Sequence, residues 1–335
     1  MNSKLKTLLQ LLLWTGIAIV LLYLTFQGRS WADLMADMRE ADGFWVLMGA
    51  ISLLGMMIFR GLRWKVMLDS AGHPVQAGNT ILSVIICYMV NSLTPKLGEI
   101  ARCSVLYRSD KIPVAASLGT VVMERVMDLI FLFAGVGLIL ISEADRLGEL
   151  FATMYHNLFG NLHPGVGIGA LALLAAAGIA ALLYLRRMSA QRGPVGKVRT
   201  FILTMYDAAK SIFRLDKPWL FIFYTLMTWI PLILMNYFFL LALPGTSDLS
   251  FYFAFVILVI GGLGWAFPVP AGIGTTHYIT LQLFVAFGLS EQAGQNNALL
   301  SNGATFVYTI VFGLIAWGLF MLQNLRKPVP AENRA

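Results

Sequence analysis

Two short segments interrupt long apolar runs with prolines, glycines and polar residues. One is NSLTPKLGEIAR at residues 91–102, and the other is FPVPAGIGTTHY at residues 267–278. Irregular backbone at membrane depth is tolerated only where protein buries it or where it lines a wet cavity. Paired interruptions of this kind are the best sequence indicator of a transporter binding site. We therefore expect the two segments to form one substrate site.

The first segment carries the chemistry of anion binding. Glu99 and Arg102 are three residues apart, so they share one face of a helix, and Asn91, Pro95 and Gly98 precede them. An arginine donates two parallel hydrogen bonds to a phosphate. We expect Arg102 to bind a lipid phosphate and Glu99 to orient it or to exchange with it. The alternative is an ion pair at the cytoplasmic edge of the membrane.

A second charged cluster follows in the chain. Glu124 and Asp128 are one helical turn apart, and Arg125 can pair with Asp128 at the i,i+3 spacing. Two interpretations are equally supported: a polar cavity built with the first segment, or an ion pair at a helix end. Arg60 and Arg63 are interpreted as positive charges that anchor a helix at the cytoplasmic surface, with contact to a lipid headgroup as the alternative.

The second segment offers backbone groups and one imidazole. Its binding candidates are Pro268, Pro270, Gly272, Gly274, Thr275 and His277. Glycines let backbone approach a ligand closely, and Thr275 and Thr276 are expected to cap a helix whose N-terminal N–H groups favour an anion. His277 is then a phosphate donor or a proton switch. The alternative is a turn with a hydrogen-bonded histidine.

Composition sets the class of protein. Of 335 residues, 58% are hydrophobic and 12% charged, and the mean hydropathy is +0.75. These values exclude a soluble globular protein. The net charge of +7 first indicates basic cytoplasmic loops, and no pattern of basic and aromatic residues indicates nucleic-acid binding. Phosphate-binding loops, nucleophile elbows and metal-ligand spacings are missing, so we expect no enzyme activity, cofactor or metal. Cys87 and Cys103 are not expected to form a disulfide.

Charge and hydropathy together predict an all-α polytopic membrane protein with cytoplasmic termini. Basic segments are assigned to the cytoplasm and acidic loops to the opposite side. The result is two re-entrant helical hairpins, residues 77–108 turning at 95–98 and residues 250–289 turning at 268–274. Six full spans accompany them, at residues 8–26, 44–59, 113–141, 166–185, 219–243 and 297–322. The alternative is about eight ordinary helices with proline kinks.

The domain organisation follows from the same pattern. We predict one integral membrane domain over residues 1–325 and a polar tail over residues 326–335. Hairpins that enter from opposite sides are typical of inverted repeats, so repeats over about 44–141 and 218–322 are considered.

Four motifs in order resemble one family. They are RGLRW at 60–64, NSLTPKLGEIAR, ERVMDL at 124–129, and FPVPAGIGTTHY. Together they are similar to the lysylphosphatidylglycerol synthase transmembrane-region family. The resemblance implies flipping or other handling of a lipid, with aminoacyl transfer performed by a separate soluble domain that this chain is expected to lack. Family members often carry Glu where this chain has His277.

The expected function is that of a flippase-like lipid transporter. We expect a multi-pass protein of the bacterial inner membrane that moves or binds a phosphate-bearing lipid, either a phospholipid or a polyprenyl-phosphate-linked lipid. Its expected partners are the membrane lipid and either a second copy of the chain or a lipid-modifying enzyme. Two alternatives remain: a non-catalytic accessory protein for envelope lipid or glycan synthesis, and an intramembrane enzyme.

Overall fold

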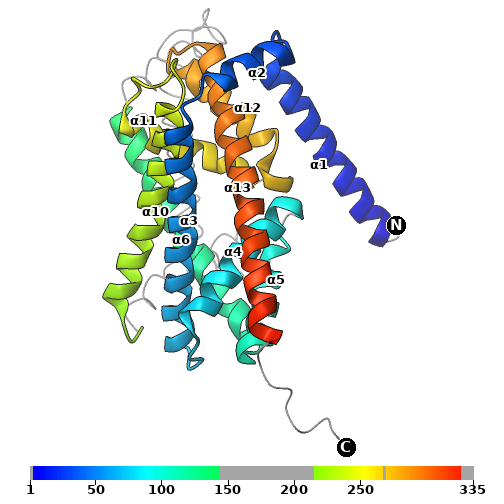
Figure 1. Ribbon diagram of the computed structural model, residues 1–335, viewed down its shortest axis with the longest axis vertical. Coiled ribbons are helices and arrows are strands. Elements are labelled where there is room, and N and C mark those ends of the chain that lie inside the picture. Colours follow the sequence, from blue (N-terminus) through cyan, green and yellow to red (C-terminus); the bar gives the residue numbers. More distant parts are fainter. Residues whose placement is uncertain (1–2, 95, 144–214, 267–268, 326–335) are drawn as a thin grey trace, which may run out of the picture. The chain divides into compact units, whose positions relative to one another are not determined.

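The computed structural model describes residues 3–94, 96–143, 215–266 and 269–325. Within these ranges the chain is helical and contains no strand (Figure 1). In order, the elements are α1 (Ser3–Phe26), α2 (Trp31–Arg39), α3 (Gly43–Ser70), α4 (Ala77–Leu93), α5 (Gly98–Asp110), α6 (Val114–Ser142), α10 (Pro218–Leu241), α11 (Phe251–Val256), the π-helix η1 (Ile257–Gly261), the 3₁₀ turns η2 (Leu263–Ala266) and η3 (Pro270–Gly272), α12 (Thr275–Ala286) and α13 (Glu291–Leu325).

The chain divides into two compact units. The first comprises Met1–Glu124 and Arg214–Ala335, and the second comprises Arg125–Phe213. Helix α6 begins in the first unit and continues into the second. The architecture and the site below belong to the first unit. The single domain over residues 1–325, the inverted repeats and the cytoplasmic termini stay predictions.

Four described helices are long and apolar enough to cross a membrane. They are Gly43–Ser70, Val114–Ser142, Pro218–Leu241 and Glu291–Gln323. The predicted all-α polytopic membrane fold is therefore confirmed. Of the other two expected spans, residues 8–26 fall within α1 and residues 166–185 lie outside the described residues.

Helix α3 is longer than the sequence suggested. The expected span ended at residue 59, whereas α3 continues to Ser70. Val66, Met67 and Leu68 lie beyond the expected end and are all buried. Because these residues are buried against the rest of the protein, the helix continues beyond Arg60 and Arg63.

The first hairpin is formed by α4 and α5, which pack directly on each other. Asn91 Oδ1 accepts a hydrogen bond of 2.8 Å from the backbone N–H of Gly98 and so joins the two arms. A Cβ atom at Gly98 would lie 2.2 Å from the carbonyl oxygen of Cys87, so this approach requires glycine. Lys96 turns the chain with a φ of 67°, and Pro95 lies outside the described residues.

The second hairpin runs from α11 through η1, η2 and η3 and returns as α12. Gly272 and Gly274 have φ values of 65° and 85°, which favour glycine in the turn. A Cβ atom at Gly264, on the first arm, would lie 2.8 Å from Thr276 Cγ2 on the second. The two arms therefore pack closely, as in the first hairpin.

Helix α13 shows that the hairpins point toward each other. Near its start, Gly294 packs against Phe284 at the end of α12, and further along, Gly313 packs against Met89 near the tip of the first hairpin. Figure 1 shows α12 beside the first part of α13 and α4 and α5 beside its later part. Turn η3 also contacts α4. The two opposed helical hairpins are thus present, and the alternative of kinked full-length helices is not what the described chain adopts.

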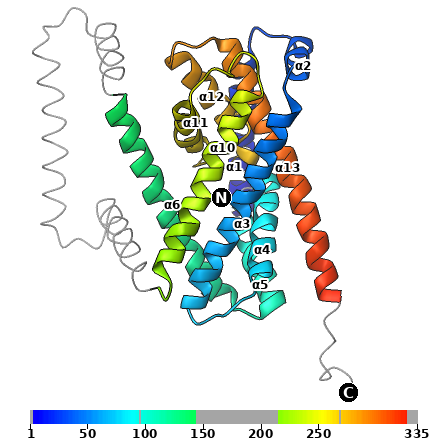
Figure 2. The same cartoon turned by 60° about the vertical axis from the view of Figure 1, so that its left-hand side comes forward.

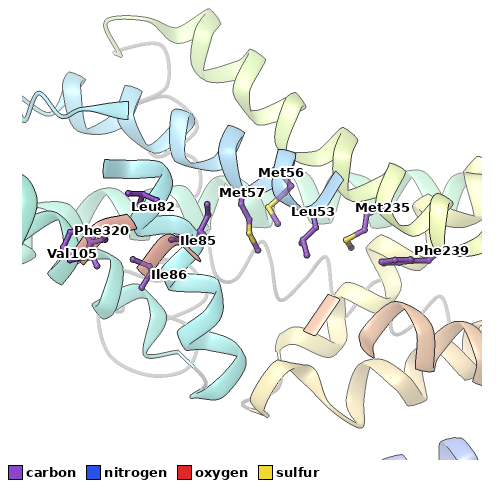
Figure 3. Close-up of a cluster of buried hydrophobic side chains, with 11 residues drawn as sticks. Leu53, Met56, Met57, Leu82, Ile85, Ile86, Val105, Met235, Phe239 and Phe320 are labelled. Carbon is purple, nitrogen blue, oxygen red and sulfur yellow. The ribbon is translucent and has the colours of Figure 1, made fainter. Parts of the chain in front are cut away.

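The apolar core holds α3 and α10 together with the first hairpin and α13. Helices α3 and α10 lie side by side (Figure 2). They approach closely at Gly49, where a Cβ atom would lie 2.6 Å from the Phe239 ring. The buried cluster in Figure 3 takes side chains from five helices, namely Leu53, Met56, Met57, Leu82, Ile85, Ile86, Val105, Met235, Phe239, Ala316 and Phe320.

Candidate functional site

One carboxylate, that of Glu124, receives hydrogen bonds from three arginines. Arg60 Nε donates to Oε1 at 2.6 Å, and Arg63 Nη2 donates to the same oxygen at 3.2 Å. Arg102 Nη1 donates to Oε2 at 3.0 Å. All four side chains are buried. A buried charge is tolerated when it is paired and hydrogen-bonded, so this arginine cluster is a built feature of the fold.

Three helices bring the cluster together. Arg60 and Arg63 lie one turn apart on α3, while Arg102 comes from α5. Helix α3 approaches α4 closely at Gly61. A Cβ atom there would lie only 2.6 Å from the Ile81 Cα, so the approach requires glycine. Trp64 Nε1 donates to Thr120 Oγ1 at 2.9 Å, which fixes α3 against the first turns of α6, one turn before Glu124.

Aromatic faces cover all three guanidinium groups, and the Cζ atom of Arg63 lies 6.0 Å from the centre of the Phe221 ring. The Cζ atom of Arg102 lies 4.5 Å from the centre of the Trp64 ring, and that of Arg60 lies 5.7 Å from the centre of the Tyr88 ring. Arg60 Nη1 also donates to the Tyr88 hydroxyl at 2.7 Å. Attraction between a cation and an aromatic face contributes about 2 kcal/mol when the pair is desolvated. The aromatic rings therefore help to hold the arginines away from water.

Arg102 keeps one edge available. Its side chain is 1% exposed, and its Nε and Nη2 atoms are buried without a hydrogen-bond partner among the described residues. These two atoms form one edge of the planar guanidinium, with parallel N–H groups that match two oxygens of a phosphate or carboxylate. Because buried polar atoms are nearly always hydrogen-bonded, this edge is a candidate position for an anionic ligand.

The structure separates the two charged residues of the first segment. Arg102 pairs with Glu124, whereas both oxygens of Glu99 lie 3.4 Å from Asn91 Nδ2. Asn91 and Gly98 hold the hairpin tip, as described above. Glu99 thus belongs to the tip, and the group that orients Arg102 is Glu124.

The later residues of ERVMDL belong to the second unit. Arg125 is exposed and Asp128 is half-buried, and both follow Glu124 on α6. Only Glu124 of this trio contributes to the arginine cluster of the first unit. Arg125 and Asp128 as binding residues stay predictions.

Sequence reasoning misplaced Arg60 and Arg63. They were expected at the membrane surface, but both are buried and hydrogen-bonded to Glu124. Their spacing of three residues places them on one helix face, but it gives no sign that this face is buried. Basic residues after an apolar run are typical of a helix end at the membrane surface, so the pattern alone does not indicate their burial.

The second hairpin contributes backbone turns and a buried imidazole. Thr275 Oγ1 donates to the carbonyl oxygens of Gly264 and Gly272, each at 2.9 Å, and Thr276 Oγ1 donates to that of Gly272 at 2.8 Å. Neither threonine caps α12, whose N-cap is Gly274, so that expectation was wrong. The hydroxyls close the turn instead. Pro270 begins η3, and Pro268 lies outside the described residues.

His277 lies inside the protein rather than at a surface turn. Its side chain is buried, and the Phe26 ring meets it edge-on with 6.0 Å between ring centres. Gly274, one turn earlier, packs against α1, because a Cβ atom there would lie 2.4 Å from the carbonyl oxygen of Ala18. Both hairpins thus supply buried polar groups. Those of the second hairpin lie apart from the arginine cluster.

Metal or thiol chemistry would need clustered ligands or reactive cysteines. Within it, no group of three or more His, Cys, Asp or Glu side chains is arranged to hold a metal ion. Cys87 and Cys103 are buried free thiols.

Comparison with known proteins places the chain in a family. The model of the lysylphosphatidylglycerol synthase TM region matches residues 9–313. The UPF0104 membrane protein PH1989 of Pyrococcus horikoshii is 24% identical over 345 residues, covering 94% of this chain and 96% of that protein. The UPF0104 membrane protein MJ1595 of Methanocaldococcus jannaschii is 31% identical over 93 residues, covering 27% and 28%. No solved structure matches. The chain is a multi-pass membrane protein that belongs to the lysylphosphatidylglycerol synthase transmembrane-region family.

Proposed function

We propose that this protein binds a phosphate-bearing lipid and moves it across the bacterial inner membrane. The lipid is either a phospholipid or a polyprenyl-phosphate-linked lipid. The observation that carries the proposal is the Nε–Nη2 edge of Arg102, which is buried, oriented and without a hydrogen-bond partner in the described chain. A lipid phosphate presents the two oxygens that this edge requires.

The surroundings of Arg102 support binding rather than bond breaking. Glu124 and Trp64 hold the guanidinium in place, so little conformational entropy is lost when a ligand arrives. Each hydrogen bond to a charged group contributes about 1.5–3 kcal/mol, enough for two such bonds to hold a headgroup that has left water. We propose a non-enzymatic protein on this basis.

The two hairpins suggest how a headgroup could cross. Their tips converge where η3 contacts α4. In this proposal the headgroup passes along the hairpins while the acyl or prenyl tails stay in the lipid. A second copy of the chain or a lipid-modifying enzyme as partner remains a prediction that this mechanism does not require.

Translocation in proteoliposomes tests the proposal. Purified protein is reconstituted with a fluorescent phospholipid, and the fraction that reaches the opposite leaflet is measured by chemical quenching. Arg102→Gln should lower the initial rate at least tenfold. Arg102→Lys should recover only part of it, because lysine keeps the charge without the planar pair of donors.

Two results would count against the proposal. If Arg102→Gln transports at the wild-type rate, the site is wrong. If a folded wild-type protein moves neither phospholipids nor a polyprenyl-phosphate lipid, transport is wrong and the accessory role in envelope synthesis is favoured. Lys65→Gln is the matched control, since Lys65 lies on α3 beside the cluster but pairs with Asp69 near the surface.

A further inference from the structure

A second set of buried polar atoms lies on α12 and α13, apart from the arginine cluster. Asn297 is 1% exposed, and both its Nδ2 and its Oδ1 are buried without a hydrogen-bond partner in the described ranges. His277 is 7% exposed, and its Nδ1 is in the same state. An unpaired buried amide is costly, so two such side chains on neighbouring helices indicate a binding position.

The packing of α12 on α13 places both residues on the shared interface. A Cβ atom at Gly294 would lie 2.9 Å from Phe284 Cβ and 3.1 Å from Leu281 Cδ1. Asn297 is three residues after Gly294, and His277 is four residues before Leu281. Residues three or four apart share a helix face, so Asn297 and His277 lie on the facing stripes of the two helices.

The helical rise brings the two side chains within reach of one small group. The helices run antiparallel through the turn at residues 287–290, so pairing of Gly294 with Phe284 sets Asn297 level with Leu281. His277 is then one turn further, about 6 Å along the axis. A bound group that contacts both side chains would have to span this separation.

The chemistry of this position differs from that of Arg102. Asn297 offers a donor and an acceptor, and His277 offers a ring nitrogen. The Phe26 ring meets His277 edge-on, and Ala298, next to Asn297 in the chain, is fully buried. The pair therefore suits a neutral group that both donates and accepts hydrogen bonds, such as a hydroxyl.

We propose that His277 and Asn297 form a subsite for a neutral hydroxyl of the lipid headgroup. This inference rests on the proposed function and adds a specificity to it: the transported lipid carries hydroxyl groups beyond its phosphate. Arg102 on the first hairpin binds the phosphate, and the subsite on the second hairpin recognises the hydroxylated part of the headgroup as it passes.

A matched pair of lipids tests the proposal. Phosphatidylglycerol and phosphatidylpropanol have the same phosphodiester charge and the same number of headgroup carbons, but only the first carries free hydroxyls. Binding of each lipid to the full-length protein in detergent is measured by native mass spectrometry. One satisfied hydrogen bond corresponds to about a tenfold difference in affinity, so wild type should prefer phosphatidylglycerol by at least that factor.

Three variants assign the preference. Asn297→Leu and His277→Phe should bring the affinity ratio close to one while phosphatidylpropanol still binds as to wild type. Arg102→Gln should weaken both lipids and keep the ratio. Asn302→Ala is the control on the same helix, because its amide already donates to the Ala298 carbonyl oxygen at 2.9 Å, and it should leave the ratio unchanged.

The outcomes separate this inference from the proposed function. A wild-type ratio near one, or a ratio that Asn297→Leu leaves intact, overturns the hydroxyl subsite alone and leaves an internal water as its occupant. Failure of both lipids to bind wild type overturns the proposed function as well. Thermal unfolding checks the variants: Asn297→Leu replaces an unpaired amide with an apolar group of similar size, so its melting temperature should not fall.

Discussion

The guanidinium carbon of Arg102 lies 4.5 Å from the centre of the Trp64 ring, and Glu124 fixes one nitrogen of the same group. Arg102 comes from α5 and Trp64 from α3, so this contact ties the first hairpin to a membrane-spanning helix. It also sets the direction in which the remaining edge of Arg102 points. Changes at Trp64 should therefore affect the ligand without removing any charge.

Trp64→Leu should weaken lipid binding by at most about thirtyfold, the equivalent of a desolvated cation–π contact of about 2 kcal/mol, because it removes the ring face that holds Arg102 in position. Trp64→Phe keeps an aromatic face and loses the hydrogen bond to Thr120, so its effect should be smaller. Lipid titration of the two variants by native mass spectrometry compares them. Equal losses in both would mean that the ring face contributes nothing to the position of Arg102.

Glu124→Gln should destabilise the protein by about 3–5 kcal/mol, because it removes the charge that three buried arginines share. Asp69→Asn is the control. It breaks the partly exposed pair with Lys65, which should cost at most about 1 kcal/mol. Unfolding in detergent measures both, and similar effects for the two variants would contradict a structural role for the Glu124 cluster.

Gly98→Ala should destabilise the first hairpin by about 1–3 kcal/mol, the usual cost of overpacking. The added methyl group would meet the Cys87 carbonyl oxygen and the Asn91 side chain, whereas one added at Gly78 on α4 would meet nothing within 4 Å. Gly78→Ala should thus be neutral or stabilising. Melting temperatures of the two variants give the comparison, and a neutral Gly98→Ala would mean that the arms can separate at no cost.

Asp37 makes a pH-dependent contribution to the stability of the folded protein, and it lies outside the membrane spans. Arg29 Nη2 donates to its Oδ2 at 2.7 Å, and Asn296 and Gln292 on α13 donate to the same oxygen. These bonds, led by that from Arg29, lower the pKa of Asp37 to about 2. A depressed pKa means that the stabilisation is complete above the unfolded pKa of about 3.9 and is lost as pH falls toward 2.

Asp37→Asn should remove this part of the pH dependence. Melting temperature is measured between pH 2 and 5 for wild type, for Asp37→Asn and for Glu40→Gln, which alters an exposed carboxylate in the same segment. Wild type and Glu40→Gln should lose stability together as pH falls. A parallel decline in Asp37→Asn would show that another group is responsible.

The hairpins could be predicted from sequence because their cause is local. A cluster of prolines and glycines within a few residues interrupts a helix, although single ones such as Gly61 in α3 and Pro231 in α10 do not, so the turns at residues 95–98 and 268–274 could be predicted without knowledge of packing. Burial of α3 beyond residue 59 was not visible in this way. A basic residue after an apolar run has the same appearance whether it meets water or a carboxylate brought from elsewhere in the chain.

The arginine cluster was unpredictable for that reason. Glu124 lies 64 residues from Arg60 in sequence, and no local pattern states which helix will face which. Asn297 was missed by a different route: it stands at the start of the expected span 297–322, where an asparagine is ordinary at a boundary. Only the packing of α13 on α12 shows that it is buried.

The carbonyl oxygen of Ala18 occupies the space that any side chain at Gly274 would need. Helix α1 therefore lies on the second hairpin as a closely fitted cover, with the end of its chain fastened to α13 by the bond from Gln295 to Thr25. The tip of that hairpin cannot swing toward α1 unless α1 moves first. The first helix, which contributes no ionisable group to either binding position in the described chain, thus sets the mechanical resistance to opening on that side.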